Sequence, residues 1–246
     1  MSGAHPGAVP FDRAVEIYEE ARPEYPPEAV ARIVERLGLR PGRAVLDLGA
    51  GTGKLTRQLV GTGARIVAVE PLPAMRARLE ELVPEAEALA GSAEAIPLPD
   101  GSIDAVTVGQ AFHWFRVDEA LPELHRVLRS GGGIALVWNV RDPADPVNAA
   151  VDEILRPYRT EAGAERRESW RALEQSPLFG PVERQDFRFD RELDAELLVR
   201  LHLSVSFVAA LDDEEQQAVA ERIRAVAPSG RFALPYVTEV FVCYRT

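Results

Sequence analysis

The sequence contains almost no lysine and a single cysteine. Lys54 is the only lysine, so 27 of the 28 basic side chains are arginine, a bias that we attribute to codon usage. Because Cys243 stands alone, the sequence excludes an internal disulfide and a cysteine-based zinc site, and we expect no bound metal. No apolar run approaches the roughly 20 residues of a membrane span, and the first residues lack the basic and apolar regions of a signal peptide. We therefore expect a cytoplasmic protein with no membrane partner.

Positive charge is also scarce overall. The chain carries 28 Lys and Arg against 39 Asp and Glu, a formal net charge of −11. The deficit is spread evenly, with 14 basic and 19 acidic side chains in residues 1–140 and 14 and 20 in residues 141–246. Such a chain offers no basic face that could neutralise phosphates, so we expect no nucleic-acid partner. A hydrophobic fraction of 46% over 246 residues is typical of an ordinary globular protein.

Short apolar runs alternate with helical spacings through the first 140 residues. Strand, crossover helix and strand in this order predict parallel strands joined by right-handed connections. We therefore predict an α/β fold with a doubly wound, mostly parallel seven-stranded sheet. The predicted strands are 44–49, 65–70, 86–90, 103–109 and 134–138, the predicted helices are 54–61, 71–83 and 117–128, and glycines 131–133 are expected to form a turn.

The last hundred residues have a different pattern. Helical spacing over 149–174 is followed by a strand at 182–189, two helices within 192–226 and a strand at 237–244. Two late strands around helices suit an antiparallel hairpin at the sheet edge and a helical cap. We expect a single domain, 1–246. Its expected parts are an N-terminal cap segment 1–35, a core 40–140, a helical cap with a late strand 147–230 and a closing strand 235–246.

A glycine-rich loop, 49–53, lies between the first predicted strand and the first predicted helix. Glycine permits a tight turn and lets a ligand approach the backbone without a Cβ in the way. A P-loop would require glycine and Ser or Thr at the positions of Leu48 and Leu55. A dinucleotide fingerprint would require glycine where Lys54 stands. Both interpretations fail, and we interpret Lys54 as a surface residue at the start of a helix.

The remaining spacing, G-x-G-x-G, resembles the first motif of S-adenosylmethionine-dependent methyltransferases. Glu70 ends the second predicted strand, 17 residues beyond Gly53, where a carboxylate can accept hydrogen bonds from ribose hydroxyls. Segments 100–109 and 124–133 resemble the fourth strand and the glycine turn of the same family. In order, these motifs identify roughly residues 40–140 as similar to the Rossmann-like type-11 methyltransferase domain family. Ser92, where the family often has Asp, and Ser130, in place of Pro, are departures.

The resemblance implies a cofactor site in core 40–140, with S-adenosylmethionine converted to S-adenosylhomocysteine. It implies that the glycines shape the cofactor loop, that Asp47 orders the amino end of the cofactor, that Glu70 binds ribose and that the 91–94 turn meets adenine. The residues assigned to the cofactor are Tyr18, Arg22, Asp47, Gly49, Ala50, Gly51, Gly53, Glu70, Pro71, Ser92, Ala93, Glu94 and Gln110.

Segment 18–26 resembles a "Y-x-x-x-R-P-x-Y-P" segment of relatives similar to trans-aconitate methyltransferases. In those relatives this segment folds over the cofactor. The resemblance implies that Arg22 pairs with the methionine carboxylate and that Tyr18 lies beside it. The alternatives are a surface ion pair for Arg22 and core packing for Tyr18.

Candidate acceptor residues follow the fourth and fifth strands, where ligands of such sheets bind. His113, in the loop after 103–109, is either a general base or substrate-orienting donor or a structural histidine in an aromatic cluster. A carboxylate acceptor needs no base because it is ionised at pH 7. Arg141, in a segment resembling "W-N-x-R-D", either holds an anionic acceptor or pairs with Asp142 or Asp145. The candidates are His113, Trp114, Trp138, Asn139, Arg141, Ser206 and Phe207, the last two with helix packing as the alternative.

The resemblance therefore implies an enzyme that methylates a small-molecule acceptor, and by resemblance alone we favour the oxygen of a carboxylate or hydroxyl. Two other classes stay open. A nicotinamide-dependent oxidoreductase could use the same topology, although Lys54 in place of the third fingerprint glycine speaks against it. A non-catalytic, cofactor-binding regulatory protein could retain the fold, although a cap with an aromatic loop speaks against that.

Overall fold

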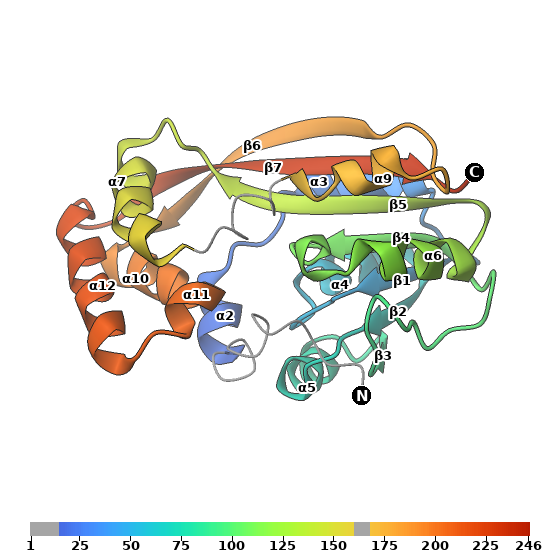
Figure 1. The fold of residues 1–246 in the computed structure, drawn as a ribbon, viewed down its shortest axis with the longest axis horizontal. Coiled ribbons are helices and arrows are strands. Elements are labelled where there is room, and N and C mark those ends of the chain that lie inside the picture. The colour runs from blue at the N-terminus through green and yellow to red at the C-terminus, as the bar shows by residue number, and fades with distance from the viewer. Residues whose placement is uncertain (1–14, 160–167) are drawn as a thin grey trace.

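The computed structural model describes residues 15–159 and 168–246, without the side chains of residues 16–18. Seven strands form one sheet in the order β3-β2-β1-β4-β5-β7-β6, with β7 antiparallel to both neighbours and the other pairs parallel (Figure 1). The predicted doubly wound sheet with an antiparallel edge hairpin is confirmed. The strands are β1 Ala44–Leu48, β2 Arg65–Val69, β3 Glu87–Leu89, β4 Ile103–Gly109, β5 Leu128–Arg141, β6 Glu183–Leu193 and β7 Phe232–Tyr244.

Helices cover both faces of the sheet because neighbouring side chains of each strand enter different hydrophobic cores. On β1, Leu46 packs in the core that contains Leu124 of α6, whereas Val45 packs in the core that contains Ile33 of α3. The helices around the sheet are α3 Pro27–Leu37, α4 Lys54–Leu59, α5 Pro73–Leu82, α6 Val117–Val127 and α9 Arg171–Gln175, with short 3-10 helices η2 Val60–Thr62 and η3 Phe112–Trp114.

The three strands on one side of the sheet are longer than the sequence predicts. β5 begins six residues before the predicted start at residue 134, because the predicted glycine turn lies inside this strand. There the pairing with β4 shifts, and Gly131 has a φ of +72°. At their other ends β5, β7 and β6 pair with one another out to Arg141 and Leu193. Residues 139–141 of β5 are only partly buried, and residues 190–192 of β6 are charged. Pro235 interrupts the apolar residues of the β7 extension, so none of the three extensions has a continuous apolar run to reveal it.

The extended strands carry a separate group of helices, which we call the cap (Figure 1). A third hydrophobic core joins these helices, and Leu198, Val219 and Val151 are among its fully buried members. The predicted pair of helices within 192–226 is wrong in number, since three helices occupy this range. The cap helices are α2 Val15–Ala21, α7 Pro146–Leu155, η4 Arg156–Tyr158, α10 Ala195–Leu203, α11 Ser206–Ala209 and α12 Asp213–Val226.

The predicted division of the domain into residue ranges stays a prediction. Within the range 1–35, helix α3 packs on the sheet and α2 packs against α10 of the cap. None of the helices in the described ranges combines the length and apolarity needed to cross a membrane.

Candidate active site

Two adjoining cavities open at the carboxyl ends of β1 and β4. The loop cavity, of about 250 Å³, is lined by the loops after β1, β2, β3 and β4 and by Phe207 of the cap. The cap cavity, of about 260 Å³, lies between the glycine loop, the ends of β5 and β7, and helix α10. Arg22, Gln110 and His113 line both cavities, so the two form one continuous, two-part site.

The glycine loop requires glycine for two different reasons. Gly49, Gly51 and Gly53 have φ values of +70°, +59° and +87°, a region that favours glycine. A Cβ on Gly49 would lie 2.7 Å from the Cβ of Ala111, and a Cβ on Gly53 would lie 2.9 Å from Val83. A Cβ on Gly51 would meet no described atom within 4 Å. Gly51 lines the loop cavity, so its backbone is open to a ligand there.

Glu70 ties the glycine loop to the next crossover. Its carboxylate accepts hydrogen bonds from the backbone N–H of Gly51 at 2.8 Å and of Leu72 at 2.9 Å. Burial raises the pKa of Glu70 to about 7, while these N–H groups and Arg76 oppose the rise and Asp47 adds to it. A carboxylate has about four acceptor positions, so each oxygen that is bonded here can accept one hydrogen bond more from a ligand in the loop cavity.

The turn after β3 forms another part of the wall of the loop cavity. The Ser92 hydroxyl is buried and has no hydrogen-bond partner among the described residues. Ala93 is buried, and Glu94 accepts the backbone N–H of Arg116 at 2.9 Å. Pro71 lines the same cavity. A buried hydroxyl without a partner costs free energy, so Ser92 is a group that a ligand would satisfy.

Asp47 lies in the floor of the cap cavity, next to Ala50 of the loop. It is almost completely buried, and its carboxylate accepts hydrogen bonds from Thr56 at 2.6 Å and Thr107 at 3.0 Å. Burial raises the pKa of Asp47 to about 6, although the two hydroxyls oppose the rise. Asp47 thus holds the first strand, helix α4 and β4 together beneath the cavity.

Gln110 lies where the two cavities meet. It is the only residue other than glycine with a positive φ, +57°, in the described part of the chain. Its backbone N–H donates to Val137 at 2.9 Å, and its side-chain amide donates to the carbonyl of Asn139 at 3.2 Å. Such a backbone conformation costs free energy and is held here by β5, which is typical of functional sites.

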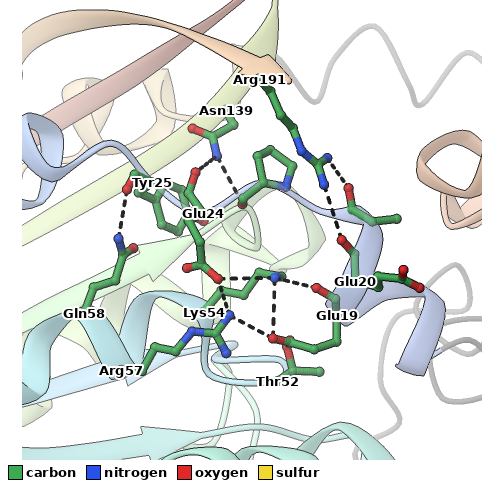
Figure 2. A network of polar contacts seen from close by, with 12 residues as sticks. Glu19, Glu20, Glu24, Tyr25, Thr52, Lys54, Arg57, Gln58, Asn139 and Arg191 are labelled. Carbon is green, nitrogen blue, oxygen red and sulfur yellow. Dashed lines mark hydrogen bonds and ion pairs between the residues drawn. The ribbon is translucent and has the colours of Figure 1, made fainter. Parts of the chain in front are cut away.

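The interpretation of Lys54 as a surface residue is wrong. Its side chain is 11% exposed, and Nζ donates to the Glu19 carbonyl at 2.7 Å and lies 3.5 Å from the carboxylates of both Glu19 and Glu24. Arg57 pairs with the same two carboxylates, as Figure 2 shows. The error arises because the segment that buries Lys54 lies about 30 residues earlier in the sequence.

The segment 19–25 is held between the core and the cap through its backbone carbonyls (Figure 2). Gln58 donates to the Tyr25 carbonyl at 2.8 Å, and Arg191 of β6 donates to the Glu20 carbonyl at 3.3 Å. Asn139 donates to the Glu24 carbonyl at 3.1 Å and accepts from Thr238 at 2.6 Å. Both ends of the Asn139 amide therefore have partners that position this segment. Asn139 also lines the cap cavity, and its predicted contact with the methyl acceptor stays a prediction.

The two residues predicted in the N-terminal segment differ in what the structure says of them. Arg22 lines both cavities and donates to the hydroxyl of Ser204 at 3.1 Å and to its carbonyl at 3.2 Å. It thus joins the segment to helix α10 of the cap. The side chain of Tyr18 lies outside the described residues, so its predicted role stays a prediction.

The aromatic candidates line the passage between the cavities. His113 and Trp114 have ring centroids 4.9 Å apart, and Nε1 of Trp138 lies 3.5 Å from Nδ1 of His113. Trp138 also packs edge-on against Phe241 of β7. His113 therefore lies in an aromatic cluster and at the cavity wall at once, and both predicted roles remain compatible with its position.

Arg141 points into the cap and not along its own loop. Its Nη2 donates to Asp152 of α7 at 2.7 Å, so the partner is neither Asp142 nor Asp145. Its Nη1 is buried and has no partner in the described ranges. Burial lowers the pKa of the Arg141 guanidinium, which Asp152 opposes. Of the two cap candidates, Ser206 is buried, and Ser206 and Phe207 line the loop cavity.

His202 and Tyr236 line the cap cavity, and the sequence did not assign either residue to the site. Both are buried, and neither His202 Nε2 nor the Tyr236 hydroxyl meets the geometry of a hydrogen bond to a described residue. Burial raises the pKa of Tyr236, whose hydroxyl lies among Arg22, Arg141 and Arg191. His202 lies on α10 and Ser206 begins the separate helix α11, so only burial beside the cavity singles out His202.

The fold and this two-part site define a Rossmann-like protein with a pocket at the glycine loop and a second pocket under a cap. A family model described as "Methyltransferase domain" matches residues 46–136. The chain is 40% identical over 242 residues to an uncharacterized methyltransferase of Mycobacterium tuberculosis, covering 96% of this chain and 94% of that protein. The chain therefore belongs to the S-adenosylmethionine-dependent methyltransferases, and it is an enzyme of that class.

The chain is also similar to a protein of a second organism and to a solved structure. An uncharacterized methyltransferase-like protein of Schizosaccharomyces pombe is 37% identical over 240 residues, covering 96% of this chain and 92% of that protein. The structure of a protein from Anaeromyxobacter dehalogenans, proposed to be a type II methyltransferase, matches with a TM-score of 0.67 at 24% identity. That match covers 91% of this chain and 97% of the other, and it supports the fold.

Proposed function

We propose that the enzyme transfers a methyl group from S-adenosylmethionine to a small-molecule acceptor, on the oxygen of a carboxylate or a hydroxyl. The observation that carries the proposal is the pair of adjoining cavities that share Gln110 and His113. One cavity presents open backbone and the buried carboxylate of Glu70. The other presents buried Arg141, His202 and Tyr236 together with the carboxylates of Asp47 and Glu239. A site with two such halves suits two reactants held next to each other.

The loop cavity fits the cofactor in three respects. Gly51 has open space where a side chain would be, and Ser92 has a buried hydroxyl without a partner. Glu70 retains acceptor positions for the two ribose hydroxyls. When bound, the cofactor supplies a methyl group on a sulfonium, which is transferred to a lone pair of the acceptor. Asp47, Gln110 and Arg22 would hold its amino-acid end, next to the cap cavity.

The cap cavity would hold the acceptor, and the residues around it would align it and exclude water. We assign His113 to positioning the acceptor at the junction of the cavities. It would act as a base only for a hydroxyl acceptor, because a carboxylate is already ionised at pH 7. The similarity of segment 18–26 to trans-aconitate methyltransferases, and the cytoplasmic location, stay predictions; the former favours a small acidic acceptor.

Calorimetry with S-adenosylhomocysteine and with NAD tests the cofactor assignment. We expect S-adenosylhomocysteine to bind and NAD to give no signal, and tight NAD binding without S-adenosylhomocysteine binding would favour an oxidoreductase. Glu70→Ala should weaken S-adenosylhomocysteine binding by about 1–3 kcal/mol, because it removes the carboxylate that accepts the ribose hydroxyls. Unchanged affinity in this variant would contradict the ribose assignment.

A product screen with labelled cofactor tests the acceptor class. Libraries of carboxylic acids, phenols and amines would be incubated with the enzyme, and we expect labelled methyl esters or ethers. Labelled products from amines alone would contradict O-methylation. S-adenosylhomocysteine binding without transfer to any library would place the acceptor outside these three chemical classes.

A further inference from the structure

The cap cavity contains buried polar atoms that the cofactor assignment does not use. We propose that it binds an acceptor through two different anchors, an oxyanion on Arg141 and a hydroxyl that donates to His202. The inference rests on the proposed function, since it assumes that the cap cavity holds the acceptor. The atom that receives the methyl group would be a third group, presented at the junction beside His113.

The first anchor, Arg141, is inferred because its guanidinium lacks one hydrogen-bond partner among the described residues. Its guanidinium uses Nη2 for Asp152 and leaves Nη1 buried without a partner in the described ranges. An arginine in a protein stays protonated, so the unpaired N–H carries positive charge. A buried charged donor without an acceptor is costly, and an oxyanion would relieve that cost.

The charges around this point also favour an anion. Asp152 accepts from Arg141 at 2.7 Å and from Arg159 at 2.6 Å, so one carboxylate faces two guanidinium groups. Arg22 approaches the same cavity from the N-terminal segment. The positive charges of Arg141, Arg22 and Arg159 all act to lower the pKa of His202. This end of the cavity is therefore locally cationic, although the chain as a whole carries a net charge of −11.

The second anchor follows from the tautomer of His202. Its Nδ1 lies 2.7 Å from the Leu198 carbonyl, an oxygen that can only accept, so Nδ1 carries the proton. Burial, the largest cause, holds the pKa of His202 well below its usual 6.5, so the ring is neutral at pH 7. Nε2 is then a hydrogen-bond acceptor, buried and without a partner among the described residues. Only a donor on the ligand satisfies it, which excludes a second carboxylate at this place.

The rest of the cavity wall limits the shape of the acceptor. Trp138, Leu201 and Val205 supply apolar surface, and the whole cavity measures about 260 Å³, part of it beside the glycine loop. Such a space suits a small, partly apolar molecule. The chemistry that fits is a hydroxylated acid, in which the oxyanion is a carboxylate or a phosphate.

The experiment measures ligand binding by calorimetry to the full-length protein saturated with S-adenosylhomocysteine. The probes are 2-, 3- and 4-hydroxybenzoate, benzoate, phenol and phenyl phosphate. We expect one hydroxybenzoate to bind roughly tenfold or more tightly than either benzoate or phenol, because it alone supplies both anchors. The comparison of benzoate with phenyl phosphate shows which oxyanion the site prefers.

Variants separate the two anchors. Arg141→Met should weaken benzoate and the best hydroxybenzoate alike, roughly tenfold or more, and Arg141→Lys should weaken them less. His202→Leu should leave benzoate binding unchanged and remove the advantage of the hydroxyl group. Arg188→Met, at an arginine whose side chain is 79% exposed, is the matched control and should change nothing. Thermal unfolding and S-adenosylhomocysteine affinity of each variant show whether it is folded.

Several outcomes would overturn the inference. These are the absence of binding by every probe, equal affinity for benzoate, phenol and the hydroxybenzoates, or unchanged affinities in a folded Arg141→Met variant. Failure of S-adenosylhomocysteine itself to bind would instead overturn the proposed function. The two failures are therefore distinguished within one titration series.

Discussion

The loop cavity and the cap cavity are built in opposite ways. The loop cavity is shaped mainly by backbone, with glycines at positive φ and Glu70 bonded to two backbone N–H groups. The cap cavity is shaped by side chains, and Arg141 and His202 each keep a buried polar atom without a described partner. Backbone geometry suits a cofactor of fixed shape. Unpartnered side chains can be exchanged between relatives without changing the fold, which suits an acceptor that differs from one enzyme to another.

The first prediction tests whether backbone geometry shapes the loop cavity. Gly49→Ala should destabilise the protein by about 2–5 kcal/mol, because it adds left-handed strain and a clash with Ala111. Gly51→Ala adds strain without a clash and should cost about 1–2 kcal/mol. Among the molecules that stay folded, Gly51→Ala should nevertheless weaken S-adenosylhomocysteine binding more than Gly49→Ala does. Urea unfolding and calorimetry measure both effects, and equal losses of stability would contradict the distinction.

The second prediction concerns Lys54, which lines the cap cavity and binds segment 19–25. Lys54→Met removes the donor to the Glu19 carbonyl and the charge near two carboxylates, and should destabilise the protein by about 1.5–3 kcal/mol. The control is Arg65→Met, which breaks an exposed pair with Glu87 and should cost at most about 1 kcal/mol. Urea unfolding at pH 7 measures both changes. Equal costs would mean that the burial of Lys54 contributes nothing to stability.

The third prediction is that acid changes the contributions of Glu70 and His202 to stability in opposite directions. The pKa of Glu70 is raised to about 7 in the folded protein, so folding gains stability as the pH falls from about 7 toward the unfolded value of 4.5. The pKa of His202 is lowered, so the unfolded chain takes up a proton first and stability is lost as the pH falls below 6.5. Each effect amounts to at most about 1.4 kcal/mol per pH unit.

Urea unfolding between pH 8 and pH 5 measures the two effects through separate variants. Glu70→Gln should lose more stability on acidification than the unmodified protein, because the compensating proton uptake is gone. His202→Gln should lose less below pH 6.5. Parallel pH profiles for both variants and the unmodified protein would show that neither group titrates differently in the folded state.

The fourth and smallest prediction concerns Ser92. Because its buried hydroxyl costs free energy without a described partner, Ser92→Ala should leave stability unchanged or raise it. It should weaken S-adenosylhomocysteine binding by about 0.5–1.5 kcal/mol through the loss of one hydrogen bond. Ser102→Ala, which removes an exposed hydroxyl bonded to the Pro99 carbonyl, is the control for binding. Identical affinities in both variants would mean that Ser92 does not contact the cofactor.

Glu70 and the turn at Ser92, which the sequence assigned to the cofactor, line the loop cavity, whereas His202 and Tyr236 of the cap cavity had no assignment. The glycine loop, Glu70 and the turn at Ser92 each follow a strand, and the carboxyl ends of parallel strands meet at one edge of the sheet. The topology of the sheet alone therefore places these residues next to one another. Arg141 and Asn139 also follow a strand, but their partners come from α7 and from segment 19–25, and no local pattern encodes those contacts.

The sequence by itself determined the order of strands and helices in the first 140 residues, the class of enzyme and the position of the glycine loop. These features depend on periodicity and on spacing within short stretches of chain. Only the tertiary structure decided that the single lysine is buried, that Arg22 bonds Ser204 across 182 residues, and that His202 faces the cap cavity. The burial of a side chain and its partners depend on which distant segments pack together, and here that packing gathers polar residues around one cavity.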